Sequence, residues 1–470
     1  MRYQLISGTT CRQATIFFLS LFFLLFSLFA RTTFASFTLD DEKKLGKEFY
    51  ERLEKGNALS QNEAANDYIT RLGGRILAHS DKVPFDFKFS IVRSTAINAF
   101  ATPGGYVYVN QGLINLVENE GQLAGVLAHE IAHVNGRHIA ELVDKSQKLN
   151  ISSLAAILAG AFLGGSSDAT AAVAAFTMAT VTTLSLKYSR EQEEAADRAG
   201  ISYLTAAGYS GQGMLEFLKI MKRYEYYSNS IPSYFLTHPG TDERSRYIDA
   251  LLQTTYTRPG ASDMDGNLKR IQTILLLDSK TAESSNLTHF QKILDDNPRD
   301  VNALYGLAFT QDKLGMAGES LATYRRALNL APNDSDILRD LGITLFKLGR
   351  FDDAAVYLKR ALRINDGDSR VVLYSGKTAE ALGDLSNAIR FYRMFEQNHP
   401  DDQEIQYNLA MAYGKANRPG DSHYYFGLYF KKKNKTDSAL FHFKAAQPYF
   451  QTDSPRSKEI AEEIKKLGRR

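Results

Sequence analysis

Cysteine is nearly absent from this chain of 470 residues, since the only one is Cys11. It lies before an uncharged apolar run from Ala14 to Ala30, so a chain cleaved after that run would contain no cysteine. Such a chain forms no disulfide, has no thiol nucleophile and builds no zinc site with cysteine ligands. Any metal would therefore be held by histidine and carboxylate side chains.

An excess of charge of one sign is also missing. The chain has 56 Lys and Arg residues against 53 Asp and Glu residues, which leaves a net charge of +3. No basic stripe interleaved with aromatic residues occurs either, so we expect no nucleic-acid partner. The length of 470 residues predicts two or three domains.

The first 35 residues have the features of a signal peptide. Arg2 and Arg12 supply positive charge before the apolar run, and Thr33-Phe34-Ala35 places small residues at positions −3 and −1 of a cleavage site before Ser36. Because the run approaches the minimum length of a membrane span, an uncleaved anchor is the alternative. We favour cleavage, which predicts residues 1–35 as a signal peptide and an exported chain.

Proline is absent between Val109 and Tyr209, which leaves a long stretch free to form helices. Within it, the two histidines of His129-Glu130-Ile131-Ala132-His133 are four residues apart and share one face of a helix. Glu130 lies about 100° further around the helix, where it can hold a water beside a metal without ligating the metal. This is the H-E-x-x-H arrangement of zinc peptidases. The alternative is a pair of histidines that only satisfy a core helix. Apolar residues at helical spacing predict that the helix is buried: Leu123, Ala124, Val126, Leu127, Ile131 and Val134.

A short β region precedes this predicted helix. Phe87 to Val92 alternates in polarity, and Tyr106 to Val109 is rich in aromatic and β-branched residues. We expect Pro103-Gly104-Gly105 to form the turn between these two strands. The pattern from 36 to 256 therefore predicts an α+β, mostly α, domain with a small sheet beside the zinc helix.

From about Asn267 onward the sequence repeats every 34 residues. Small residues recur at two positions, where they permit close helix crossings, and large residues recur at a third. This pattern resembles the tetratricopeptide repeat (TPR), which stacks helix pairs into an α-solenoid. We expect TPR helix pairs over 257–450, including one further pair out of phase with the preceding unit, and a capping helix within 451–470. The recurring residues are Ala308, Gly342, Gly376 and Ala410; Ser320, Ala354, Ala388 and Ser422; and Tyr324, Leu358, Tyr392 and Phe426.

A third metal ligand is expected from an acidic segment, residues 189–197. Glu193 and Asp197 are four residues apart and share a helical face, so one can ligate a metal while the other supports a ligand histidine. The alternative is a solvated helix surface, which such acidic clusters often form.

These segments together resemble the zinc peptidases of family M48. The resemblance is carried by His129 to His133 followed by Ser189-Arg190, Glu193 and Asp197. It covers about Ser36 to Ala250 and implies a gluzincin-type fold with one Zn²⁺ per chain. By resemblance, the zinc ligands are His129, His133 and Glu193, and the general base is Glu130. Asp197 does not bind the metal but orients one of its ligands. Further matches are Asn98 to Gly105, Thr237-His238-Pro239 and Arg244.

With a signal in front and repeats behind, the chain resembles the periplasmic β-barrel assembly-enhancing protease group. The resemblance implies a zinc metalloendopeptidase of the bacterial periplasm that acts on misfolded or stalled outer-membrane proteins. The repeats would recruit clients or the outer-membrane assembly machinery. The alternative is a chaperone-like assembly scaffold whose peptidase is mostly latent.

Substrate is expected to lie extended along a strand edge at Asn98, Ala99 and Phe100, where backbone pairing accepts many sequences. His238 has two alternative roles: it donates a hydrogen bond to the oxyanion of the reaction, or it is a fourth zinc ligand that keeps the enzyme latent. We favour the second role. Arg244 either contacts substrate or pairs with a local carboxylate such as Asp242.

The segment from Ile151 to Leu186 is apolar apart from Asp168 and is rich in Ala, Gly and Leu. It predicts two short helices broken at residues 164–167. Each is too short for a confident membrane span, so packing within the protease domain is the simpler interpretation. The alternative is a helical lid that contacts the membrane surface or a membrane-protein client.

Overall fold

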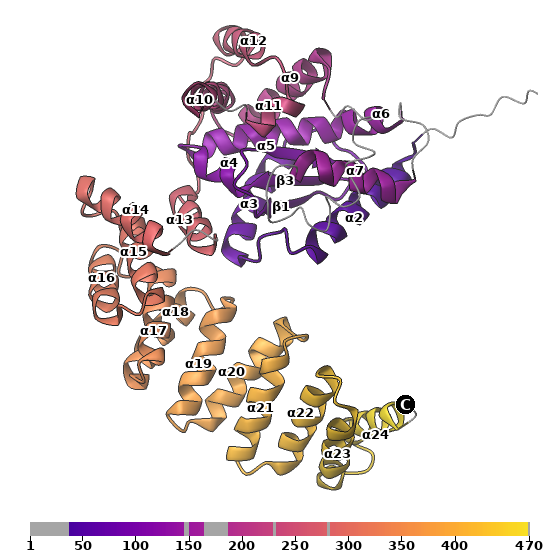
Figure 1. The fold of residues 1–470 in the computed structure, drawn as a ribbon, viewed down its shortest axis with the longest axis vertical. Helices are drawn as coiled ribbons and strands as arrows, with labels where there is room; N and C mark the ends of the chain where they lie inside the picture. Colours follow the sequence, from indigo (N-terminus) through magenta and orange to yellow (C-terminus); the bar gives the residue numbers. More distant parts are fainter. Residues whose placement is uncertain (1–36, 145–149, 164–186, 229–231, 280–282, 469–470) are drawn as a thin grey trace, which may run out of the picture. The chain divides into compact units, whose positions relative to one another are not determined.

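The computed structural model describes residues 37–144, 150–163, 187–228, 232–279 and 283–468. The predicted signal peptide, 1–35, and the second half of the apolar segment, 164–186, lie outside the described residues. The chain divides into two compact units, Met1–Leu275 and Leu276–Arg470. The first is mostly helical with a small sheet and the second is a helical repeat array, which confirms the predicted fold class (Figure 1).

The sheet of the first unit has three strands in the order β1-β3-β2. These are β1 (Lys88–Val92), β2 (Ala99–Thr102) and β3 (Tyr106–Asn110). Strand β1 pairs parallel to β3, and β2 pairs antiparallel to β3. The predicted turn at Gly104 and Gly105, both with positive φ, therefore joins β2 to β3, and the expectation that it joins β1 to β3 was wrong. The strand edge expected at Asn98 to Phe100 was not counted when β1 and β3 were expected to be joined by one turn, and the presence of β2 between them makes β1 and β3 parallel.

The helices of the first unit lie around this sheet (Figure 1). Their bounds are α2 (Leu39–Lys55), α3 (Glu63–Leu77), α4 (Gln111–Leu116), α5 (Glu120–Asn135), α6 (His138–Asp144), α7 (Ile151–Leu163), α9 (Arg190–Ala206), α10 (Gln212–Ser228), α11 (Ser233–Thr237), α12 (Thr241–Thr254) and α13 (Leu268–Asp278), the last of which spans the division between the units.

Helix α5 is the centre of the first unit. The side chain of Asn119 caps it by accepting a hydrogen bond from the backbone N–H of Gln122, and every residue from Glu120 to Val134 is buried. Helices α3, α9 and α10 and strand β2 pack around it. The apolar spacing around the histidine motif is therefore explained by a helix that is covered on all sides, as predicted.

Glu120, at the start of α5, ties a later segment of the chain to this core. Its buried carboxylate accepts hydrogen bonds from the hydroxyls of Tyr68 and Tyr209 and from the backbone N–H groups of Met264 and Asp265. Residues 264 and 265, which follow the predicted domain boundary at 256, are thus bonded to the core of the first unit, while that boundary stays a prediction.

Helix α7 packs against α2 within the first unit. Its Leu154 and Leu158 lie in one buried cluster with Leu45 and Phe49 of α2. For the described part of the apolar segment, packing within the domain is therefore the observed arrangement. Among all described residues, no helix is both long and apolar enough to cross a membrane.

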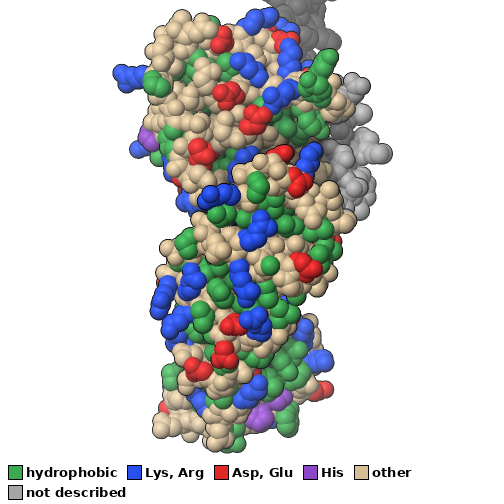
Figure 2. Space-filling view, turned by 90° about the vertical axis from the view of Figure 1, so that its left-hand side faces the viewer, with side chains coloured by type: hydrophobic (Ala, Val, Ile, Leu, Met, Phe, Trp, Pro, Cys, Tyr) green, Lys and Arg blue, Asp and Glu red, His purple; other side chains and the backbone are tan. Residues whose placement is uncertain are grey.

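The second unit is a chain of helix pairs in which each helix packs on its neighbours in sequence. Lys and Arg side chains are interspersed with hydrophobic ones on its surface (Figure 2). The helices are α14 (Glu283–Asp296), α15 (Val301–Lys313), α16 (Ala317–Leu330), α17 (Ser335–Lys347), α18 (Phe351–Ile364), α19 (Ser369–Ala381), α20 (Leu385–Asn398), α21 (Gln403–Lys415), α22 (Pro419–Lys432), α23 (Thr436–Ala446) and α24 (Pro455–Leu467).

Close contacts between a glycine and a large residue 16 positions later define the repeat. A Cβ atom added to Gly342 would lie 2.8 Å from Cγ of Leu358, and one added to Gly376 would lie 2.7 Å from Cδ1 of Tyr392. The same relation holds for Gly427, at 2.6 Å from Cδ1 of Phe443. Gly427 follows Gly376 by 51 residues, which is one and a half repeats of 34. Helix α22 therefore ends one pair and begins the next, as the out-of-phase pattern predicted.

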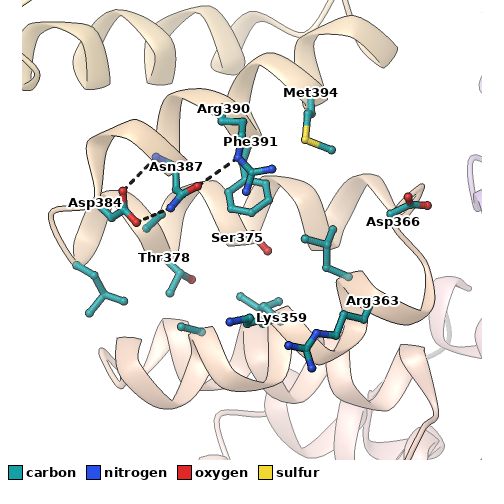
Figure 3. Close-up of a pocket in the computed structure, with 15 residues that line it drawn as sticks. Lys359, Arg363, Asp366, Ser375, Thr378, Asp384, Asn387, Arg390, Phe391 and Met394 are labelled. Carbon is teal, nitrogen blue, oxygen red and sulfur yellow. Dashed lines mark hydrogen bonds between the residues drawn. The ribbon is translucent and has the colours of Figure 1, made fainter.

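A cavity of about 650 Å³ lies between α18, α19 and α20 (Figure 3). Hydrophobic, hydroxyl and charged side chains all line it, including Leu358 and Lys359 from α18, Ser375 from α19, and Phe391 from α20. It is a feature of the repeat unit alone.

Candidate metal centre

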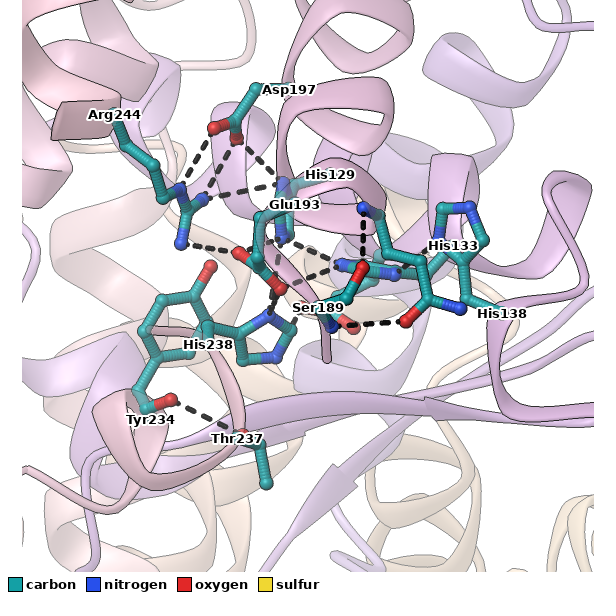
Figure 4. A network of polar contacts seen from close by, with 12 residues as sticks. His129, His133, His138, Ser189, Glu193, Asp197, Tyr234, Thr237, His238 and Arg244 are labelled. Atoms are coloured by element: carbon teal, nitrogen blue, oxygen red, sulfur yellow. Dashed lines mark hydrogen bonds and ion pairs between the residues drawn. The ribbon is translucent and has the colours of Figure 1, made fainter. Parts of the chain in front are cut away.

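Three separate segments bring the predicted metal ligands together (Figure 4). Helix α5 carries His129 and His133, and α9 carries Glu193, whose helix starts with Ser189 as its cap. His238 follows directly after the short helix α11. All four side chains are at most 1 % exposed.

The donor atoms of these four residues surround one point. Nε2 of His129 lies 3.0 Å from Nε2 of His133 and 3.2 Å from Nδ1 of His238. Oε1 of Glu193 lies 3.0 Å from Nδ1 of His238 and 3.4 Å from Nε2 of His133. Ligands of a tetrahedral zinc ion with bonds of about 2.0–2.1 Å are about 3.3 Å apart. The four donors therefore fit one zinc ion, and their set, three histidines and one glutamate, is a metal site.

Charge balance also favours a bound cation. Glu130, Glu193, Asp197 and Arg244 are all buried at the site, which leaves a net charge of −2 when the histidines are neutral and all three carboxyl groups are ionised. Burial lowers the pKa of His133 well below its usual value, so this imidazole is neutral near pH 7. An uncompensated buried charge is costly, and a divalent cation would neutralise this one.

The carboxylate of Asp197 contacts the ring nitrogen of His129 that is not one of the cluster's donor atoms. Its Oδ1 lies 2.8 Å from Nδ1 of His129, so this ring nitrogen donates the hydrogen bond and Nε2 keeps its lone pair. Although burial opposes ionisation, Arg244 and His129 lower the pKa of Asp197 below its usual value. The geometry thus accommodates the orienting role that the resemblance implies.

Arg244 does not pair with Asp242. Its side chain is buried and has almost no contact with solvent. Asp242 pairs with Lys222 instead. Arg244 is 3 % exposed and donates to both carboxylate oxygens of Asp197, while its Nη1 lies 2.6 Å from Oε2 of Glu193. Of the two alternatives for Arg244, the local pair with Asp242 is wrong, because a carboxylate 47 residues earlier in the chain lies closer in space.

Glu130 lies beside the cluster without joining it. Both of its carboxylate oxygens are buried and accept no hydrogen bond from any described residue, and Oε1 lies 3.5 Å from Nε2 of His238. Burial raises the pKa of Glu130 to about 7. A carboxylate with this pKa is suited to accepting and returning a proton near neutral pH.

Three aromatic or imidazole side chains at the site were missed by sequence reasoning. Nδ1 of His138 lies 2.7 Å from Nδ1 of His133. The ring of Tyr188 stacks on His133 with centroids 3.9 Å apart, and that of Tyr234 stacks on His238 at 4.3 Å. These contacts fix the orientation of two ligand rings. Adjacency to the motifs was the only signal in the sequence, since His138 follows His133 by five residues and Tyr188 precedes Ser189.

The structure places the predicted substrate residues in and before β2. Asn98, Ala99 and Phe100 are buried, so their side chains face the core. Because β2 is the last strand in the order β1-β3-β2, it forms an edge of the described sheet. Any contact with substrate would therefore be made by the backbone.

Two parts of the sequence match known protein families. Residues 63–252 match peptidase family M48, and residues 313–373 and 370–402 match tetratricopeptide repeats. The chain contains a family M48 peptidase domain. TPR helix pairs follow it.

Curated relatives match about half of the chain. The beta-barrel assembly-enhancing protease of Yersinia pestis is 34% identical over 48% of this chain and 46% of its own length. The protein of the same name from Escherichia coli (strain K12) is 32% identical over the same shares. This chain thus matches about half the length of these relatives. Among solved structures, that of PilW, a type IV pilus biogenesis factor, aligns with 43% of this chain and 97% of its own at 18% identity and a TM-score of 0.33.

Proposed function

We propose that the protein is a zinc-dependent endopeptidase. The observation that carries the proposal is the buried cluster of His129, His133, Glu193 and His238 with the carboxylate of Glu130 beside it. Three or four such ligands with an adjacent general base are typical of zinc hydrolases. The match of the surrounding residues to peptidase family M48 supports peptide bonds as the target.

Each residue has a proposed role in hydrolysis. His129, His133 and Glu193 would hold the zinc ion, which supplies a Lewis acid that polarises a carbonyl and makes water more acidic. Glu130 takes the proton of the attacking water and passes it to the leaving amine. Asp197 keeps His129 in the tautomer whose Nε2 is free to ligate, through the contact of 2.8 Å with Nδ1.

Substrate is proposed to pair with the backbone of the β2 edge at Asn98, Ala99 and Phe100. An extended peptide added to this edge would make main-chain hydrogen bonds that do not depend on its side chains, so many sequences would be accepted. Helix α5, which carries His129 and His133, packs against β2.

His238 is proposed to restrain the enzyme as a fourth zinc ligand. Its Nδ1 lies among the other donor atoms rather than facing an open space. The segment before it also contacts the proposed substrate edge, since the backbone N–H of Tyr234 donates to the carbonyl of Ile97 at 3.1 Å. One segment would therefore block both the fourth metal position and the start of the edge.

The cellular role is proposed from the names of the relatives and from the predicted signal peptide. We infer an enzyme of the bacterial periplasm that cleaves misfolded or stalled outer-membrane proteins, with the repeats binding clients or the assembly machinery. The second candidate is an assembly scaffold whose peptidase is mostly latent, which the position of His238 favours. A Glu130→Gln variant that still supports client assembly would favour the scaffold.

The proposed activity is tested by zinc content and by cleavage of casein, an unfolded protein. We expect Glu130→Gln to retain one zinc per chain and to lose cleavage by roughly 10²–10⁴-fold, because a general base contributes about this much. His129→Ala and Glu193→Gln should lose both zinc and cleavage. Glu191→Gln, an exposed residue of the same helix, is the matched control and should lose neither. Stoichiometric zinc in both ligand variants would overturn the proposed site.

A further inference from the structure

The cavity between α18, α19 and α20 has apolar side chains in its lining from all three helices. Its walls include Leu358 and Leu362 from α18, Leu382 from the end of α19, and Phe391 and Met394 from α20. With a volume of about 650 Å³ it can hold several side chains of a bound segment.

Two residues that line this cavity, Ser375 and Thr378, have hydroxyl groups without partners among the described residues. Oγ of Ser375 and Oγ1 of Thr378 are buried and make no hydrogen bond. The residues are 8 % and 2 % exposed, and both come from α19. A buried hydroxyl without a partner costs free energy, whereas one that meets a bound ligand contributes to affinity and orientation.

Some charged residues of the cavity have hydrogen-bond partners among the described residues and others have none. Lys359 and Arg363 on α18 are exposed, and neither forms an ion pair with a described carboxylate. Arg390, on the opposite wall, donates from Nε to Oδ1 of Asn387 (Figure 3). The carboxylate of Asp384 accepts from the backbone N–H and the side-chain amide of Asn387, so both of its oxygens are occupied.

Of the three cations and two carboxylates that line the cavity, the groups left for a ligand are therefore mainly cationic. Asp366 lies exposed at one end (Figure 3). Ser375 and Thr378 lie between the wall that carries Lys359 and the wall that carries Arg390 (Figure 3).

We propose that this cavity binds a short acidic peptide segment that carries apolar side chains. Carboxylates of the segment pair with Lys359 and Arg363, and its apolar side chains enter between Leu358 and Phe391. The hydroxyls of Ser375 and Thr378 hydrogen bond to its backbone amide groups. The site lies wholly within the repeat unit, and the proposal does not depend on the peptidase activity.

The spacing of polar groups favours a peptide over a fatty acid. A fatty acid has one polar end and would place its alkyl chain over the two hydroxyls, which would stay without partners. A peptide carries a donor and an acceptor at every residue, so it satisfies groups in the middle of the cavity as well as charges at its walls.

The proposal is tested by fluorescence anisotropy with the full chain carrying Glu130→Gln, so that the probe is not cleaved. The probe is a fluorescein-labelled decapeptide of alternating Glu and Leu. We expect Lys359→Glu with Arg363→Glu to weaken binding by at least about tenfold, since two ion pairs are replaced by repulsion. The double variant Arg325→Glu and Arg326→Glu, which makes the same charge change on exposed residues of α16, should leave the Kd unchanged.

A second variant separates binding from folding. Replacing Ser375 by Ala and Thr378 by Val removes the two unpartnered hydroxyls at almost constant shape. We expect the free protein to melt at the same or a higher temperature and the probe to bind several-fold more weakly. Unchanged binding in this variant, equal binding of a Lys-Leu decapeptide, or displacement of the probe by laurate would each overturn the proposal.

Discussion

Arg244 and Asp197 form a two-point pair in which Nε and Nη2 of the guanidinium each donate to a carboxylate oxygen at 2.8 Å. The same carboxylate accepts from Nδ1 of His129, and the same guanidinium lies 2.6 Å from Glu193. One buried pair thus contacts a metal ligand on α5 and another on α9. Arg244 positions the ligand set without being part of it.

Replacing Arg244 by Met should lower zinc affinity by about 10–100-fold, because loss of a group that orients ligands typically has this effect. It also leaves Asp197 buried without its cation, so the first unit should melt at a lower temperature. Zinc affinity is measured by competition with a chromogenic chelator. Arg246→Met changes an exposed residue of the same helix and serves as the control. Equal zinc retention by both variants would show that Arg244 is dispensable for the site.

Replacing His238 by Ala should increase cleavage of casein while zinc stays bound through the other three ligands. The reason is that removing the fourth donor opens a position at the metal. Initial cleavage rates and zinc content of the variant are compared with those of Leu236→Ala, a largely exposed neighbour. A loss of cleavage with zinc retained would instead favour the oxyanion role of His238.

The carboxylate of Asp340 should make the repeat unit sensitive to acid. It accepts hydrogen bonds from Arg339 and Tyr305 and is 3 % exposed. Although burial opposes ionisation, Arg339 and Arg370 lower its pKa to about 2 from an ordinary value of 3.8. A lowered folded-state pKa adds stability that is present above pH 4 and is lost as pH falls through 2, here about 2 kcal/mol.

Amide hydrogen exchange in α17 measures this effect. The difference in opening free energy between the wild type and Asp340→Asn should narrow by about 2 kcal/mol between pH 5 and pH 2, because protonation makes the two side chains equivalent in charge. A difference that stays constant across this range would mean that Asp340 is not ionised in the folded protein.

Adding a methyl group to Gly427 tests the shared helix α22. The new Cβ would lie 2.6 Å from Phe443, so Gly427→Ala should destabilise the repeat unit by about 1–3 kcal/mol. Gly318 lies in α16 with no atom within 4 Å of such a Cβ, and Gly318→Ala should be neutral or stabilising by up to about 1 kcal/mol. Thermal unfolding compares the two. Equal effects would place the end of the array in another register.

Part of the metal cluster was predictable from short-range spacing, while the choice of Glu193 as a ligand and the match at His238 came from the resemblance to family M48. His129 and His133 are fixed by helical spacing, and Glu193 and Asp197 repeat that spacing on a second helix. The repeat register was predictable for a similar reason, since Gly427 and Phe443 keep the separation of 16 that Gly376 and Tyr392 show.

What escaped prediction depends on long-range packing. The partner of Arg244 lies 47 residues away on α9, while Asp242 is only two residues away in sequence but pairs with Lys222. The parallel pairing of β1 and β3 requires knowing that four residues between them, Ala99–Thr102, form a strand. Neither contact can be read from the spacing of nearby residues, because each depends on how segments far apart in the sequence pack together around α5.

The order of the metal donors along the chain has a consequence for the timing of activity. The first donor is at residue 129 and the last at 238, and Arg244 lies six residues beyond it. A polypeptide is made from its amino end, so a growing chain has no complete site until α12 has emerged. All four donors are therefore available to a metal only after the chain through His238 has been made. The proposed peptidase therefore has no functioning centre during the period when its own backbone is unfolded and open to cleavage.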